Sequence, residues 1–244
     1  MTINLGYFRW AICLLAITFS SIAYAQQPST NAVPAPTTSA PSTDATSSQP
    51  NPSADSLHEI IQLLHDEQYD TALVKVNAAI KLYPKLGGFY ALRGSIYSER
   101  NLFPQAEQDF QTALQLDPGN IVVKFNLVEL KLMQKEFDPA RAGFIELEKD
   151  PDMADLAAYK VFLCDLFAGH EDVAKKELDT FNDAGTKPSY YFSNAAWSLY
   201  HKNIEDGRSW LVSASNIYTP IKNEYYASTL RNFGYLPLPQ PVMK

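Results

Sequence analysis

Small side chains recur along this chain at a regular spacing. Ala72, Ala106, Ala140 and Ala174 follow one another at a constant interval of about 34 positions, and Gly207 comes one position earlier than the same interval would place it. A bulky apolar residue stands four positions after each: Val76, Phe110, Phe144, Leu178 and Leu211. A fixed period in the range of roughly 20–50 residues indicates a repeat architecture, in which one supersecondary unit is stacked on the next. The recurrence therefore predicts a stack of similar units rather than a single closed core.

Further positions repeat around these small residues. The second block has the fullest set, which is Gly94, Tyr97, Ala106, Phe110, Ala113 and Pro118. The first block keeps Ala72, Val76, Ala79 and Pro84, the third keeps Ala140, Phe144 and Pro151, and the last two keep only Ala174, Leu178, Gly207 and Leu211. This pattern resembles the tetratricopeptide repeat, a helix–turn–helix unit of about 34 residues. Its small residues let paired helices approach closely, and its prolines end the unit.

The resemblance implies an all-α fold, a right-handed α-solenoid of about five helix pairs with a C-terminal capping helix. We expect it over residues 55–234, with repeats at about 53–86, 87–120, 121–154, 155–187 and 188–220. Thr219 and Pro220 form a typical helix start, so the capping helix is predicted at 220–233, over the last repeat. Residues 235–244 contain three prolines and are expected to form an extended tail.

Residues 1–25 have the pattern of a secretory signal peptide. Arg9 precedes an apolar run from Trp10 to Ile17, and Ala23-Tyr24-Ala25 forms a small-residue cleavage site. The run is short of the ~20 apolar residues that span a membrane, so cleavage is favoured over retention as an anchor. Residues 26–54 are rich in Pro, Ser, Thr and Ala and are predicted to be a disordered linker. The mature product is expected in the periplasm or outside the cell, without stable membrane insertion.

The charge and cysteine content exclude several classes of function. The chain has 20 Lys and Arg against 27 Asp and Glu, and no basic cluster that a nucleic-acid groove needs, so nucleic acid is not expected as a partner. Cys13 leaves with the signal segment, so Cys164 has no cysteine left to pair with. It stands in an apolar helix and is expected to be buried and inert.

No pattern for catalysis, a cofactor or a metal is present. His58 and His65 are about two helical turns apart, too far to share one zinc ion, and His170 and His201 stand in or next to turns. Asp150, Asp152 and Asp155 lack the central Gly and distal Glu of a calcium loop, and are interpreted as a turn between repeats. The chain is therefore predicted to be no enzyme and to bind no cofactor.

In solenoids of this kind the first helices of successive pairs line the concave face, where family members commonly bind a peptide. A clamp for a C-terminal carboxylate needs Lys, Asn and Arg there, whereas the equivalent positions here are Leu57, Ile61, Ala91, Ser95, Phe125 and Glu129. The C-terminal half of the predicted groove is apolar instead. Its candidate partner-binding residues are Phe125, Leu132, Met133, Tyr159, Leu163, Leu166, Phe167, Phe192, Leu199 and Tyr200.

An apolar surface of this size requires a cover. Three covers are possible: the tail from Tyr235 to Met243 or a tightly curled superhelix, a second copy of the chain, or a peptide of another protein. The favoured function is a non-catalytic protein–protein interaction scaffold or adaptor of the bacterial cell envelope, which binds a partner segment in the concave groove. The alternatives are a regulatory or structural subunit of an exported enzyme complex, and a self-associating structural protein.

Overall fold

The structure is a computed structural model that describes residues 52–182 and 186–237. Within these two ranges it has eleven α-helices and no strand, so the predicted all-α class is confirmed. The helices are α2 (Pro52–His65), α3 (Tyr69–Leu82), α4 (Gly87–Glu99), α5 (Phe103–Leu116), α6 (Ile121–Met133), α7 (Phe137–Leu147), α8 (Ala154–Ala168), α9 (Glu171–Leu178), α10 (Pro188–Tyr200), α11 (Ile204–Ile217) and α12 (Pro220–Asn232).

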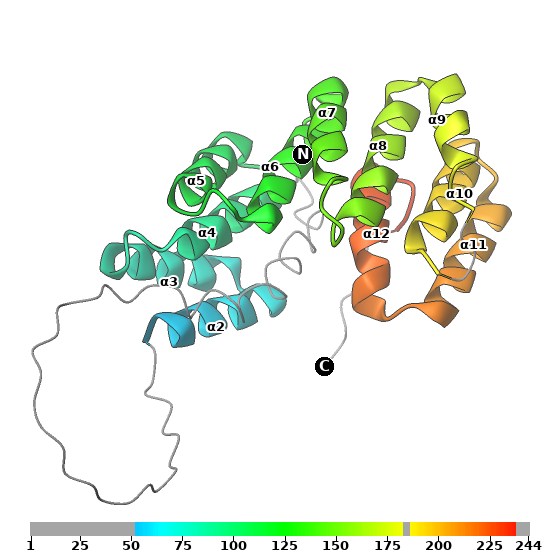
Figure 1. The fold of residues 1–244 in the computed structure, drawn as a ribbon. Helices are drawn as coiled ribbons and strands as arrows, with labels where there is room; N and C mark the ends of the chain where they lie inside the picture. The colour runs from blue at the N-terminus through cyan, green and yellow to red at the C-terminus, as the bar shows by residue number, and fades with distance from the viewer. Residues whose placement is uncertain (1–51, 183–185, 238–244) are drawn as a thin grey trace, which may run out of the picture.

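Consecutive helices form antiparallel pairs that stack in the order of the sequence. Each of α2, α4, α6, α8 and α10 packs against the helix that follows it, and each pair packs against the next. Figure 1 shows the stack running from α2 at one end to α10 and α11 at the other. The predicted solenoid of helix pairs is therefore confirmed.

The turn inside each pair has the same backbone conformation. Glu67, Asn101, Lys135 and Lys202 adopt positive φ angles of 57° to 63°, and Gly169 takes this place in the fourth pair with φ 82°. The next residue donates its N–H back into the first helix, as from Leu102 to the carbonyl of Tyr97 at 2.8 Å. This left-handed step reverses the chain over a very short turn. Because four of the five residues are not glycine, the turns were not recognisable from composition.

The recurring small residues lie at the contact between the two helices of a pair. Ala72, Ala106, Ala140 and Ala174 have no exposed surface. A Cβ atom added to Gly207 would lie 2.6 Å from Leu199 Cγ, which shows how closely α10 and α11 approach. Of the fourteen predicted repeat-packing residues, Tyr97 and Leu211 are partly buried, and the others are buried: Ala72, Val76, Ala79, Gly94, Ala106, Phe110, Ala113, Ala140, Phe144, Ala174, Leu178 and Gly207.

The two ends of the solenoid differ from the expectation. Helix α2 begins at Pro52, so residues 52–54, which are expected in the linker, are helical; proline fits the first turn of a helix because its missing N–H is not needed there. Helix α12 does more than cap the last pair, since it packs on α8 and α10 as well as on α11. Figure 1 shows it lying along α8. The predicted signal segment 1–25, linker residues 26–51 and tail residues 238–244 lie outside the described residues.

Candidate functional site

The predicted groove residues divide into a buried majority and a partly exposed minority. Met133, Phe167 and Tyr200 keep part of their surface exposed. The other seven are buried in the core: Phe125, Leu132, Tyr159, Leu163, Leu166, Phe192 and Leu199. Neighbouring helix pairs and α12 enclose these seven residues, so in this structure they are covered by helices of the same chain, and their role in binding a partner stays a prediction. Apolarity alone did not distinguish a groove residue from a core residue.

Helix α12 and the residues after it cover this half of the inner face. The Phe233 ring stacks on Phe167 with centroids 4.5 Å apart, and the Tyr235 ring stacks on the same residue at 5.2 Å. Tyr226 packs against both Tyr159 and Phe192 at 5.3 Å. Among the described residues the cover consists of α12, Phe233 and Tyr235, which is the first residue of the predicted tail.

Three buried polar residues occupy equivalent positions on the inner helices. Asn126, Lys160 and Ser193 each stand at the same distance along the chain before the small residue of their pair, and their exposed fractions are 3%, 0% and 0%. The sequence pattern did not reveal them, because apolar residues dominate each of these helices. The signal was present, since Asn126 and Lys160 stand exactly one repeat period apart in otherwise apolar helices. Buried polar groups need hydrogen-bond partners, so what each of these three residues contributes depends on the partners that it has in the structure.

The buried charge of Lys160 is neutralised across two pairs. Its Nζ donates to Glu129 Oε1 at 2.5 Å and also to the Thr229 hydroxyl of α12. The ammonium group lies 5.8 Å from the centre of the Phe125 ring. A fully buried ammonium group is tolerated only with such partners. Lys160 thus connects α6, α8 and α12.

Asp155, the last of the three aspartates around the turn before α8, joins α8 to α10 and α12. Its carboxylate accepts hydrogen bonds from the Ser189 hydroxyl at 2.5 Å and the Tyr226 hydroxyl at 2.6 Å. Asp150 accepts from the backbone N–H of Asp152, within the turn itself. Burial, and then the nearby negative charge of Asp155, raise the pKa of Tyr226, so its hydroxyl stays a donor.

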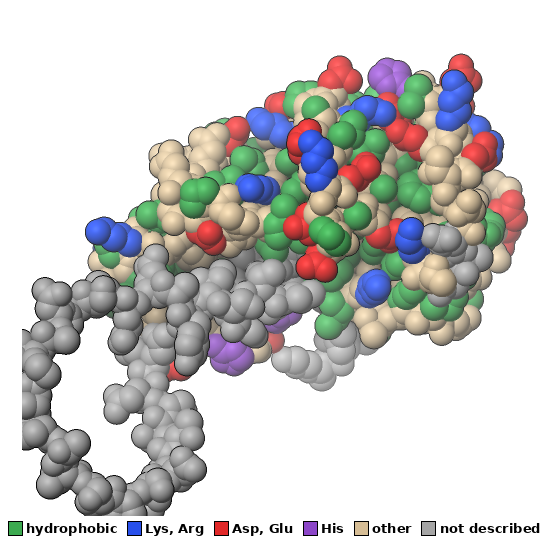
Figure 2. Space-filling view, viewed as in Figure 1, with side chains coloured by type: hydrophobic (Ala, Val, Ile, Leu, Met, Phe, Trp, Pro, Cys, Tyr) green, Lys and Arg blue, Asp and Glu red, His purple; other side chains and the backbone are tan. Residues whose placement is uncertain are grey.

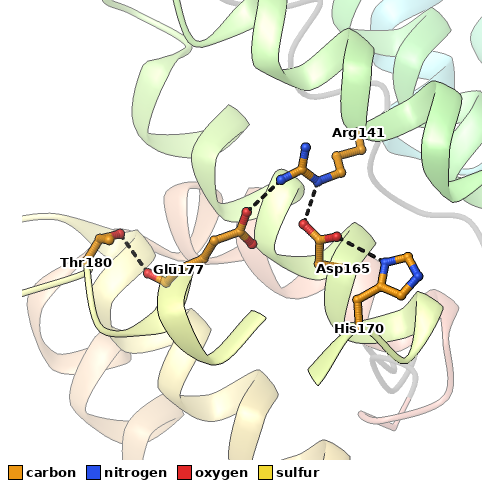
Figure 3. A network of polar contacts seen from close by, with 5 residues as sticks. All are labelled: Arg141, Asp165, His170, Glu177 and Thr180. Carbon is orange, nitrogen blue, oxygen red and sulfur yellow. Dashed lines mark hydrogen bonds and ion pairs between the residues drawn. The ribbon is translucent and has the colours of Figure 1, made fainter. Parts of the chain in front are cut away.

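A second polar network joins the third and fourth pairs away from α12. In Figure 3, Arg141 of α7 lies between two carboxylates, with its Nε 2.5 Å from Asp165 of α8 and its Nη2 3.1 Å from Glu177 of α9. His170 flanks the network, with Nδ1 3.3 Å from Asp165. One guanidinium group is shared by two carboxylates, so their charges are not fully balanced. Burial, and then the charge of Asp165, raise the pKa of Glu177 to about 7, against the lowering effect of Arg141.

This pKa gives a stability prediction. In the unfolded chain Glu177 ionises near its ordinary 4.5, whereas the folded chain holds the proton up to about 7. The folded state binds more protons between these values, so this residue's contribution to stability falls as pH rises through the window. We expect Glu177→Gln to be more stabilising at pH 8 than at pH 4.5 by about 2 kcal/mol, after an allowance for partial solvent screening. Urea unfolding at both pH values measures it.

The control for this comparison is Glu205→Gln, since Glu205 has an 89% exposed side chain on α11. It should show a difference between the two pH values of less than about 0.5 kcal/mol. Equal effects of the two substitutions at both pH values would show that the network around Arg141 does not hold a proton on Glu177.

The remaining sequence candidates show no converging chemistry. Cys164 is free and buried, as expected, and burial raises the pKa of its thiol to about 12. His201 follows the last residue of α10, and its Nε2 lies 3.2 Å from Oε2 of Glu171, the first residue of α9. His58 and His65 lie on α2. Across residues 52–182 and 186–237, no three His, Cys, Asp or Glu side chains are grouped as metal ligands. Within the same ranges no helix has the length and apolarity to cross a bilayer.

The surface charges do not form a field of one sign on the visible face. Figure 2 shows Lys and Arg side chains interspersed with Asp and Glu over the middle of the stack. Interspersed charges favour contacts with individual side chains over attraction of a highly charged polymer. The inner face next to α12, with its line of buried polar residues, is the candidate site.

Comparison with known proteins relates the chain to other helical repeats. A family model described as the tetratricopeptide repeat matches residues 99–160. Sperm-associated antigen 1 from Rattus norvegicus is 29% identical over 122 residues, which span 50% of this chain but only 12% of that protein.

Solved structures with a similar fold include PilW and Pseudomonas aeruginosa pilF. PilW, described as a widely conserved type IV pilus biogenesis factor, has a TM-score of 0.55 at 15% identity, over 77% of this chain and 91% of that one. Pseudomonas aeruginosa pilF has a TM-score of 0.54 at 14% identity, over 75% of this chain and 86% of that one. At these identities the likeness concerns the fold alone.

Proposed function

We propose, on the premise that this chain is a tetratricopeptide-repeat protein, that it is a non-catalytic scaffold or adaptor of the bacterial cell envelope whose inner face binds a segment of another protein. Protein–protein interaction is the role that this class of fold suggests. Export rests on the predicted signal segment, cleavage of which would leave Gln26 as the first residue. One observation at the inner face supports the binding role: the buried side-chain amide of Asn126 has no hydrogen-bond partner among the described residues.

Asn126 is a buried amide without a partner. It is 3% exposed, and neither its Oδ1 nor its Nδ2 has a hydrogen-bond partner among the residues that the structure describes. Such a group costs roughly 1–3 kcal/mol when it is left unpaired. An amide offers one acceptor and two donor hydrogens, which match the N–H and C=O groups of a bound polypeptide. Both polar atoms are covered in this structure, so a segment pairs with them only after the side chains over them move, and the pairing would remove this cost. This gain supports binding of a peptide segment at this point.

The position of Asn126 supports a site for the segment beside α12. Asn126, Glu129 and Met133 are spaced by three and four residues, so they share one side of α6. The last two already contact α12, because Glu129 accepts from Thr229 at 3.3 Å and the Met133 sulfur accepts from Asn232 at 3.4 Å. Asn126 continues this line one turn earlier and has no such bond to α12. We propose that a partner segment uses this part of the line.

The test combines binding and stability. Peptides would be selected from a displayed random library on the full chain, and their affinity for Asn126→Leu measured by titration calorimetry. We expect at least a tenfold loss of affinity, while the stability of the chain stays equal or rises because an unpaired buried amide is removed. A purely structural role for Asn126 would lower stability and leave affinity unchanged.

Gln108→Ala is the matched control, because Gln108 lies on α5, the second helix of its pair and therefore away from the inner face. Its affinity for the selected peptides should equal that of the unaltered chain. Equal affinity of the Asn126→Leu chain, or a failure to select any peptide that binds the inner face, would contradict the proposed site.

A further inference from the structure

Helix α12 presents one polar side to the inner face through residues spaced by three. Tyr226 donates to Asp155 of α8, Thr229 contacts Lys160 and Glu129, and Asn232 donates to Met133 at the end of α6. The seat of α12, defined as Glu129, Met133, Asp155, Tyr159 and Lys160, thus spans two helix pairs. At this seat, the contacts of α12 show which side chains a helix needs in order to dock on the inner face.

We infer that α12 can be displaced from this seat by a helix of a partner protein. That helix would carry an aromatic residue, a hydroxyl residue three positions later and an amide residue three positions after that. This inference rests on the proposed function and names the partner class for the same face. It also makes α12 an internal competitor of that partner.

The contacts select a helix over an extended peptide. Residues three apart lie on the same side of a helix, whereas they point to opposite sides of an extended chain. The seat meets side chains at 226, 229 and 232, and the Tyr159 hydroxyl reaches a backbone atom, the carbonyl of Tyr226, at 3.1 Å. Backbone groups inside a helix bond to one another along its axis, so side chains make most of the contacts with the seat. A partner helix with the same spacing would meet the same atoms.

Two features make α12 able to leave without unfolding the solenoid. First, it joins α11 through Tyr218 and Thr219, which have extended backbone conformations, and the five helix pairs also contact one another directly. Second, its docking completes the burial of Lys160, which is 0% exposed, and removing a charge from water opposes the gain from apolar contacts. The net docking free energy is therefore smaller than the contacts alone indicate.

Self-docking sets how strongly an outside helix binds. If only about one chain in 100 has an open seat, the apparent affinity of a partner is reduced about 100-fold. A tethered segment competes at an effective concentration in the mM range. Weakening α12 within the chain should therefore strengthen binding of an outside helix, although the seat itself is unchanged.

The experiment uses a labelled synthetic peptide of residues 219–236 and the full chain, with fluorescence anisotropy as the readout. A chain carrying Tyr226→Ala and Thr229→Ala should bind the peptide at least tenfold more tightly than the unaltered chain. A peptide carrying the same two substitutions should bind that chain at least tenfold more weakly. A control peptide with Ile221→Ala should bind like the original, because Ile221 is 57% exposed. Equal binding of the original peptide by both chains, or binding by neither, would overturn the inference.

Hydrogen exchange of the unaltered chain provides a second measurement that needs no variant. Amides of α12 should exchange through opening events at least tenfold more often than amides of α8. Exchange of both helices at one common rate would show that α12 leaves only on global unfolding, and would refute its displacement. Neither measurement involves Asn126 or a selected peptide, so failure of the proposed function would leave both results standing.

Discussion

Replacement of Phe110 by alanine is expected to lower the free energy of unfolding by about 3–5 kcal/mol. The Phe110 ring is 1% exposed and fills the contact between α4 and α5. It lies so close to the backbone of Gly94 that a Cβ atom added there would be 2.9 Å from the ring. A rigid backbone contact of this kind cannot collapse easily around a missing ring, so the cavity remains. Urea unfolding followed by far-UV circular dichroism measures the loss.

Gln111→Ala is the control for this substitution, because Gln111 is the next residue along α5 and is exposed. It should change the free energy of unfolding by less than about 0.5 kcal/mol. A loss below about 1 kcal/mol for Phe110→Ala would mean that the two helices are not held together by this contact. The recurrence of bulky residues four positions after each small one would then need another explanation.

The repeat pattern could be predicted because the close approach of two helices restricts the size of the side chains at their contact. A helix pair approaches closely only where one side chain is small, so Ala106 and Ala140 are tied to one place in each pair. The turns inside the pairs are different. Glu67 and Lys135 adopt left-handed conformations that glycine usually takes, so these residues carried no local signal for a turn.

The candidate site was less accessible to prediction because its residues have the same chemistry as the core. The sequence shows Tyr159 and Phe192 only as aromatic residues of two helices, whereas in the structure Tyr226 of α12 packs against both of them. That path depends on long-range contacts such as the one between Thr229 and Lys160, which periodicity cannot show. The polar residues were the better signal: Asn126 and Lys160 interrupt apolar helices at the repeat period, and buried polar groups require partners.

Replacement of Lys160 by methionine is expected to lower the free energy of unfolding by about 3–5 kcal/mol. Methionine has a similar length and keeps the apolar contacts, so the change isolates the charge. Without the ammonium group, Glu129 keeps a carboxylate with only 13% exposure, and Thr229 loses its closest polar partner. The cost therefore comes mainly from the carboxylate that is left behind. Urea unfolding followed by the fluorescence of Trp197 and Trp210 measures it.

A double substitution separates this mechanism from a simple loss of packing. If the unpaired carboxylate causes the loss, Lys160→Met combined with Glu129→Leu should recover most of it, because an apolar pair replaces a buried ion pair at little net cost. Lys149→Met is the control, since the Lys149 side chain is 68% exposed and its pair with Glu146 contributes less than about 1 kcal/mol. A double variant as unstable as the single one would show that the loss comes from packing at Lys160 and not from the carboxylate of Glu129 left without its partner.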